Sequence, residues 1–360
     1  MQHVVDDVFP ASGASAVDDR PVRPAHTLVD PEARPRRLAD LRWLLPVWVL
    51  VAAFALVTAY WSHHVGVPLR DPEGKMFRGR LASSVAWFAV LAVAESAWRT
   101  RRTTGSLRST VRTFRERWPW QRVALALSGL LAYHLVYVCY RNLKSWDAFN
   151  TPQDAHLEAF ERWIFAGHSP ADLLHEILGQ HYAAYVLAEI YQAFTYFVPF
   201  SVVACLVFTQ RIRQGFVFLT AGMWVWVLGV GSYYLIPTLG PFASAPADFA
   251  GLTHTGVTST QAEYLTERLQ LLTDRGAPDA FASISAFASL HVAFTCTIVL
   301  MLRYYGQDRL ARIMTVYLAA VMVATVYFGM HFVVDDIAGV LLALAAVHLA
   351  RLMIWPRGRT

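Results

Sequence analysis

The chain is built largely from long apolar blocks, and this feature restricts its fold more than any other. Eight blocks lie at roughly 41–61, 81–98, 121–140, 183–209, 214–236, 286–303, 310–330 and 332–354. A helix that crosses a membrane needs about 20 apolar residues, so these blocks predict eight transmembrane helices. Only 16% of the residues are charged, whereas soluble proteins reach about 25%. We therefore expect an all-α, polytopic membrane helix bundle with a turn near Phe328-Gly329-Met330.

The segments outside the blocks divide the chain. Residues 1–37 are rich in Pro, Asp, Ala and Arg without an apolar run, which predicts a disordered cytoplasmic tail. Residues 38–120 would hold two additional N-terminal transmembrane helices and a basic cytoplasmic loop. Residues 121–354 would hold the other six helices, and residues 355–360 a cytoplasmic C-terminal end.

Basic residues set the expected orientation, because cytoplasmic connections carry an excess of Lys and Arg. With a cytoplasmic tail, the inner segments hold 22 of the 31 basic residues and the outer segments hold nine. The first outer loop fits this orientation least well, since it contains Arg70, Lys75, Arg78 and Arg80. Both termini are expected in the cytoplasm, with the protein in the plasma membrane. A net charge of +5 without a soluble basic domain predicts no nucleic-acid partner.

Two outer segments are long enough to contribute structure. Residues 141–182 contain an apolar stripe at helical spacing (Leu173, Leu174, Ile177 and Leu178), which suits either a helix along the membrane interface or one packed on the bundle. Residues 237–285 are polar and predict a lid or a loop through which substrate enters.

Ionisable groups at membrane depth are costly and therefore indicate function. Ser289-Leu290-His291 is expected to open the sixth span, and His331 and Asp335 the eighth, both at the outer face. Residues four apart share a helix face, so the Asp335 carboxylate can accept an imidazole N–H and orient the ring. Such a histidine can attack phosphorus while a second histidine protonates the leaving oxygen. Ser289 and N–H groups at a helix start can hold phosphate oxygens; a helix-capping ion pair is the structural alternative for His331 and Asp335.

A third element, Tyr233–Pro241, contains Pro and Gly near the end of the fifth block. Pro and Gly end helices, so helix termination is one interpretation. A rigid outer-face turn beside the site is the other.

The order of these motifs resembles the PAP2 (type 2 phosphatidic acid phosphatase) superfamily, in its inositolphosphotransferase branch related to inositol phosphorylceramide synthase. The matching elements are YxxxPTxGP at Tyr233–Pro241, SLH at Ser289–His291, HxxxD at His331–Asp335, and the stretch Phe160–Pro170. The resemblance implies a six-helix catalytic membrane domain over residues 121–354. It also implies phosphoryl transfer through a phosphohistidine, with no metal and no cofactor.

By position, the resemblance makes His331 the nucleophile, Asp335 its orienting base and His291 the acid for the leaving group. It also places Tyr234, Pro237 and Gly240 at the substrate. Classical members of the superfamily carry a serine-arginine pair where this chain has Ala324 and Thr325, and their KxxxxxxRP element is absent here. The proline of their PSGH motif corresponds to Phe287 or Ala288, and its glycine to Leu290. The inositolphosphotransferase branch shares much of this divergence.

Another cation must therefore balance the phosphate charge. Arg141 and Lys144, just outside the third block, are the candidates, and a pair of interfacial anchor residues is the alternative.

The expected function is that of a membrane enzyme of lipid metabolism, a phosphotransferase or phosphatase that acts on lipid phosphate esters. A polyol such as inositol is one expected acceptor, and lipid phosphate or diphosphate hydrolysis is the alternative. Two other classes remain. His291, His331 and Asp335 could form a two-histidine, one-carboxylate metal site, although dense histidine boxes are lacking. A non-catalytic transporter would show paired broken spans, and the sequence contains no clear pair.

Overall fold

The computed structural model describes residues 38–101 and 105–356, and these residues form helices and no strand. The predicted tail at 1–37 and the last four residues lie outside the described part of the chain. Eight long helices form the bundle: α2 (Leu45–Val65), α3 (Arg80–Arg101), α5 (Trp120–Trp146), α8 (Tyr182–Phe208), α9 (Ile212–Leu235), α12 (Leu290–Tyr304), α13 (Asp308–Tyr327) and α14 (Val333–Ile354).

Within the described residues, seven helices are long and apolar enough to cross a membrane, and α12 is a shorter apolar helix of 15 residues. The chain is therefore an integral membrane protein with an all-α, polytopic bundle, as the apolar blocks predict. The expected turn between the last two helices is confirmed, since α13 ends at Tyr327 and Gly329 has a φ of 62°.

The bounds of α5 and α12 differ from the apolar blocks. α5 continues to Trp146, so Arg141 and Lys144 lie in its last two turns rather than outside it. Asn142, Leu143, Ser145 and Trp146 between and beyond them are buried against protein, which permits polar residues in the helix. α12 begins only at Leu290, because the hydroxyl of Ser289 accepts a hydrogen bond from the Val292 N–H at 3.5 Å and caps the helix.

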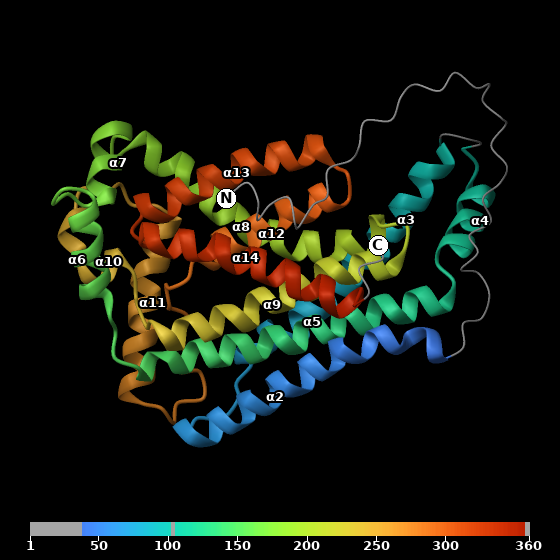
Figure 1. Cartoon of the computed structure of the whole chain (residues 1–360), viewed down its shortest axis with the longest axis horizontal. Helices are drawn as coiled ribbons and strands as arrows, with labels where there is room; N and C mark the ends of the chain where they lie inside the picture. The colour runs from blue at the N-terminus through green and yellow to red at the C-terminus, as the bar shows by residue number, and fades with distance from the viewer. Residues whose placement is uncertain (1–37, 102–104, 357–360) are drawn as a thin grey trace.

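Shorter helices gather at both ends of the bundle (Figure 1). At one end lies α4 (Leu107–Arg117), an amphipathic helix inside the predicted basic loop. At the other end lie α6 (Asp154–Ile164), α7 (Pro170–Leu178), α10 (Pro241–Ser244) and α11 (Gly256–Thr273). The two long segments that were predicted to share the outer face therefore share one end of the molecule.

The predicted apolar stripe forms α7, which packs on the bundle through one face. His175 is buried there, and its Nε2 lies 2.8 Å from the carbonyl oxygen of Tyr327 at the end of α13. The opposite face exposes Ile177, which keeps 77% of its surface accessible. Packing on the bundle is therefore confirmed for one face of α7, and its position along the membrane interface stays a prediction.

α9 runs through the bundle and packs against α5, α8, α12 and α14. Two glycines permit the closest approaches around α12. A Cβ on Gly229 would lie 2.6 Å from a methyl carbon of Leu290, and one on Gly339 would lie 2.5 Å from the carbonyl oxygen of Ser289. Because neither space admits a side chain, α9 and α14 fix the start of α12.

The basic loop between α2 and α3 is tied to the bundle. Arg70 is buried, and its guanidinium donates hydrogen bonds to the carbonyl oxygens of Ala280 and Arg275. The Oδ1 atom of Asn142 accepts a hydrogen bond from the Arg70 N–H at 2.7 Å, and its Nδ2 donates one to the Arg70 carbonyl oxygen at 2.9 Å. This structural use accounts for one of the four basic residues that fitted the charge rule poorly.

Candidate active site

Two histidines face each other at the end of the bundle that carries α6, α7, α10 and α11. His291 is the second residue of α12, as the sequence predicts. His331 lies before α14, two residues ahead of Val333, so the expectation that it opens the last helix is wrong. The backbone N–H groups of Met330 and His331 bond to the carbonyl of Thr325 and fold this turn back on α13. The two imidazole ring centroids lie 6.0 Å apart.

Asp335 lies beside His331. Its Oδ2 is 3.5 Å from Nδ1 of His331, and both side chains are buried. The same oxygen accepts a hydrogen bond from the Phe332 N–H at 3.0 Å, which caps α14. The carboxylate therefore caps the helix start and lies close to the ring, but Nδ1 of His331 is buried without a hydrogen-bond partner among the described residues, so the orienting role stays a prediction. Burial lowers the pKa of His331 to about 4, although the neighbouring Asp336 carboxylate opposes the shift, so the imidazole is neutral at physiological pH.

Sequence reasoning missed Asp336, which is also buried in this turn. Its Oδ2 accepts a hydrogen bond at 2.8 Å from the hydroxyl of Thr325. Thr325 occupies one position of the serine-arginine pair carried by classical members of the superfamily that the sequence resembles. The sequence signal that could have identified Asp336 is the pair of consecutive acidic residues at 335 and 336, near the start of an apolar block.

Two further carboxylates outside the spans organise the backbone around the histidines. Glu161 of α6 accepts hydrogen bonds from the N–H groups of Val333 and Val334, at the start of α14. Burial, together with the nearby Asp335 carboxylate, raises the pKa of Glu161 to about 7 although the N–H groups oppose the shift. The second carboxylate is that of Asp154. Both residues precede the histidines in the sequence, and Glu161 lies in the stretch Phe160–Pro170 on which the family resemblance rests.

Asp154 holds the turn that follows α9. Its carboxylate accepts hydrogen bonds from the N–H groups of Leu239 and Gly240, at 2.8 to 3.0 Å. Gly240 has a φ of 101°, and a Cβ there would lie 2.7 Å from the carbonyl oxygen of Met330. The Tyr233–Pro241 element thus ends a helix and also forms a fixed turn against the segment that carries His331.

Aromatic rings fix the orientation of His291. The ring of Tyr191 stacks on it with centroids 4.3 Å apart and planes 25° apart, and the ring of Phe194 lies at 4.2 Å. Both residues come from α8. No local pattern in the sequence indicates this contact, because aromatic residues are common throughout the spans.

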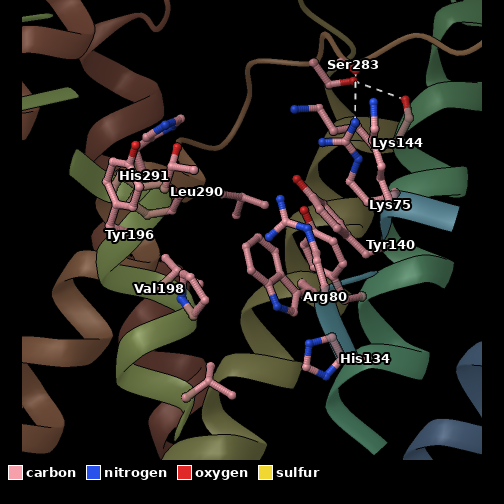
Figure 2. A pocket seen from close by; sticks show the side chains of 18 of the residues that line it. Lys75, Arg80, His134, Tyr140, Lys144, Tyr196, Val198, Ser283, Leu290 and His291 are labelled. Carbon is pink, nitrogen blue, oxygen red and sulfur yellow. Dashed lines mark hydrogen bonds between the residues drawn. The ribbon is translucent and has the colours of Figure 1, made fainter. Parts of the chain in front are cut away.

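A cavity of about 620 Å³ opens beside both histidines and has the size of a small-molecule site. Arg141 and Lys144 line it, as expected of candidates for the phosphate charge. Arg141 donates a hydrogen bond to the hydroxyl of Ser283 at 3.0 Å, and the Lys144 ammonium lies 5.4 Å from the ring centroid of Tyr233. Figure 2 shows Lys144 on the wall opposite His291.

Four other predicted residues support the walls of this cavity and do not line it. The hydroxyl of Ser289 caps α12, and that of Tyr234 donates to the carbonyl of Leu143 at 2.8 Å. The carbonyl of Pro237 accepts from the Gln153 N–H, and the N–H of Gly240 binds Asp154. Tyr233, next to Tyr234, does line the cavity.

Metal ligation is not apparent in the described part of the chain. No group of three or more His, Cys, Asp or Glu side chains there is arranged to hold a metal ion. His291, His331 and Asp335 therefore do not converge on one point as a metal site would require.

A polytopic membrane bundle that sets two histidines and a carboxylate beside basic side chains is a protein suited to phosphate esters. A family model described as the PAP2 superfamily matches residues 155–349, more than half of the chain, and the chain belongs to this superfamily. Comparisons with curated proteins and with solved structures gave no match. Members of the superfamily are phosphatases and phosphotransferases, which supports an enzyme that acts on a phosphate ester in a membrane.

Proposed function

We propose that this protein transfers a phosphoryl group from a lipid phosphate ester through a phosphohistidine at His331. The observation that carries the proposal is the pairing of His331 and His291, with ring centroids 6.0 Å apart on the wall of one cavity. A phosphorus atom between the rings would have a nucleophile on one side and a proton donor within reach of its leaving oxygen.

In the first step, Nε2 of His331 attacks phosphorus while the bond from phosphorus to the leaving oxygen breaks. Protonated His291 gives its proton to that oxygen. In the second step, now-neutral His291 removes the proton from water or an alcohol, whose oxygen attacks phosphorus and breaks the bond to His331. Asp335, 3.5 Å from Nδ1, stabilises the positive charge that the His331 ring acquires. Arg141 and Lys144 stabilise the phosphoryl oxygens.

The acceptor decides between hydrolysis and transfer. We propose transfer to a polyol such as inositol, because the motif order resembles the inositolphosphotransferase branch and the cavity has room beyond a phosphoryl group. Hydrolysis of a lipid phosphate or diphosphate is the second candidate, since water can attack the same phosphoenzyme. Lipid analysis of a deletion strain, followed by assay of the purified protein on the lipid that accumulates, separates the two.

Phosphoenzyme trapping tests the proposed chemistry directly. Wild-type protein and His331→Ala protein are mixed with ³²P-labelled lipid phosphate and quenched in alkali, which preserves phosphohistidine. We expect acid-labile label on wild type and none on His331→Ala. The proposal is overturned if active wild type carries no label under single-turnover conditions, or if the His331→Ala protein is labelled.

We also propose that the histidines face the outside of the plasma membrane, with both termini in the cytoplasm, on the basis of the 22-to-9 split of basic residues. The three native cysteines are buried, so single introduced cysteines report their own position. In intact cells, an impermeant thiol reagent should label Thr266→Cys on α11 and spare Arg108→Cys on α4. The reverse labelling pattern would place the site at the cytoplasmic face.

A further inference from the structure

The cavity beside the histidines is lined by four basic side chains: Lys75, Arg80, Arg141 and Lys144. None of its described lining residues is Asp or Glu. All four basic residues precede residue 155, where the match to the PAP2 superfamily begins, and both candidate catalytic histidines lie inside the match. The part of the chain before the matched segment thus supplies all the positive charge of Lys and Arg on the cavity wall.

The four cations form two pairs from different elements. Arg141 and Lys144 lie one turn apart on α5. Lys75 and Arg80 come from the short π-helix η4 (Lys75–Gly79) and the first residue of α3. Figure 2 shows Lys75, Arg80 and Lys144 together on the wall across from His291.

The position of Arg80 separates it from the first pair. Its guanidinium carbon lies 4.8 Å from the ring centroid of Tyr137. Tyr137 precedes Arg141 by four residues on α5, a rise of about 6 Å along the helix axis. Arg80 therefore reaches the cavity about one helical turn away from Arg141, toward the middle of the bundle.

Few of these charges are neutralised by the protein. Lys75 pairs with Glu73, but both side chains are more than 70% exposed, and an exposed pair of this kind contributes little energy. Arg80, Arg141 and Lys144 form no ion pair within the described residues. The carboxylates of Asp147 and Glu267 act on Lys144, and that of Glu267 on Arg141, only from beyond ion-pair distance. In addition, Nε of Arg141 is buried without a hydrogen-bond partner among them.

A phosphodiester carries one negative charge, and a phosphomonoester carries at most two at neutral pH. Arg141 and Lys144 suffice for one reacting phosphoryl group, which leaves Arg80 without an ion-pair partner and Lys75 with only the exposed Glu73. Uncompensated charges grouped on one wall repel one another, and an anion that lies between them relieves this repulsion.

On the basis of the proposed function, we infer that the lipid substrate carries a second anionic group, and that Lys75 and Arg80 bind this group while the first reacts at His331. A second phosphate meets this requirement, either in a lipid diphosphate or on the polyol head of a phospholipid. The two N-terminal elements would then select the substrate without taking part in bond making.

The first test compares substrates with matched acyl or prenyl chains: a lipid monophosphate, the corresponding lipid diphosphate, and a phospholipid whose polyol head carries one phosphate. For full-length wild-type protein in nanodiscs, we expect kcat/KM for at least one bis-anionic lipid to exceed that for the monophosphate. Arg80→Ala should lower this ratio at least about tenfold, which equals about 1.4 kcal/mol of discrimination. The lipid whose ratio falls identifies the source of the second phosphate.

Arg78→Ala is the matched control, because Arg78 is an exposed residue of η4, two positions before Arg80, and does not line the cavity. It should leave the ratio at the wild-type value. Arg80→Lys retains the charge and should retain most of the ratio, so it also guards against a fold defect in Arg80→Ala. Equal ratios in wild type, Arg80→Ala and Arg78→Ala would overturn the inference.

A binding measurement separates this inference from the proposed chemistry. His331→Ala protein cannot form the phosphoenzyme, so the dissociation constants of unreacted mono- and bis-anionic lipids can be measured on it. We expect tighter binding of the bis-anionic lipid, and loss of that preference in the His331→Ala, Arg80→Ala double variant. Preference without wild-type phosphoenzyme refutes the chemistry alone, and phosphoenzyme without preference refutes only the second anion site.

Discussion

The Nδ1 atom of His331 lies 3.5 Å from Oδ2 of Asp335, although His331 precedes the helix that carries Asp335. The contact is made because the same oxygen also binds the Phe332 N–H and draws the turn over the start of α14. One carboxylate therefore caps the helix start and lies beside the ring. A helix face shared by positions i and i+4 is not needed to bring them together.

Asp335→Asn should lower turnover by about 10²-fold or more, because the amide cannot stabilise a positive imidazole and favours a different tautomer. The Phe332 N–H can still bond to the amide oxygen, so the thermal midpoint should change much less than activity. Steady-state assays and thermal unfolding of purified protein measure both. Asp308→Asn, an exposed residue at the start of α13, is the control for the substitution itself. More than half of wild-type turnover in Asp335→Asn would contradict the orienting role.

His291→Ala should slow the reaction according to the leaving group. His291 contacts the rings of Tyr191 and Phe194 and forms no ion pair with a carboxylate among the described residues, and the lack of a carboxylate suits a proton donor rather than a nucleophile. We expect a loss of about 10² to 10⁴-fold with an alkoxide leaving group, and a much smaller loss with p-nitrophenyl phosphate, which needs no proton. His348→Ala, an exposed histidine of α14, should match wild type on both substrates. Equal losses for both leaving groups would remove the acid role from His291.

The sequence predicted the eight apolar helices and the meeting of the two histidines, because hydrophobic length and the order of segments determine both. It did not predict where α5 and α12 end and begin, since burial of Asn142 and capping by Ser289 depend on neighbouring helices. Glu161 and Asp154 escaped notice for a related reason. Their carboxylates accept hydrogen bonds from backbone N–H groups at least 80 residues away, and no local sequence pattern indicates such a contact.

Arg141→Ala or Lys144→Ala should lower turnover at least about tenfold, or about 1.4 kcal/mol of activation free energy. Both side chains line the cavity with the histidines, and charge stabilisation is the main need of phosphoryl transfer. The measurement is kcat on a lipid monophosphate, with exposed Arg309→Ala at the start of α13 as the control. Near-wild-type turnover in both single variants and in the double variant would assign the phosphate charge to backbone N–H groups at the helix starts.

Glu161→Gln should change how stability depends on pH. Burial raises the pKa of Glu161 from its ordinary 4.5 to about 7, so between these values the folded protein binds more protons than the unfolded chain. The free energy of unfolding contributed by this group therefore falls as pH rises from about 4.5 to about 7, by roughly 1.4 kcal/mol for each unit of pKa shift. Glutamine cannot titrate, so the thermal midpoint of wild type relative to Glu161→Gln should rise as pH is lowered through this window.

Thermal unfolding in detergent at several pH values between about 4.5 and about 8 makes this comparison. Glu176→Gln, an exposed residue of α7, is the matched control and should follow wild type at each pH. Parallel midpoint curves for wild type and Glu161→Gln would show that the Glu161 carboxylate does not take up a proton in this range.

The histidines and the basic residues of the cavity come from different stretches of the chain, with the boundary between residues 144 and 155. A graft that exchanges residues 70–80 with those of a related enzyme would replace Lys75 and Arg80 and keep Arg141, Lys144 and both histidines. The residues that select the substrate and the residues that make and break bonds could then change independently in evolution. Relatives with identical histidine motifs would be expected to act on different lipids, and the first third of the chain would be the place to look for the difference.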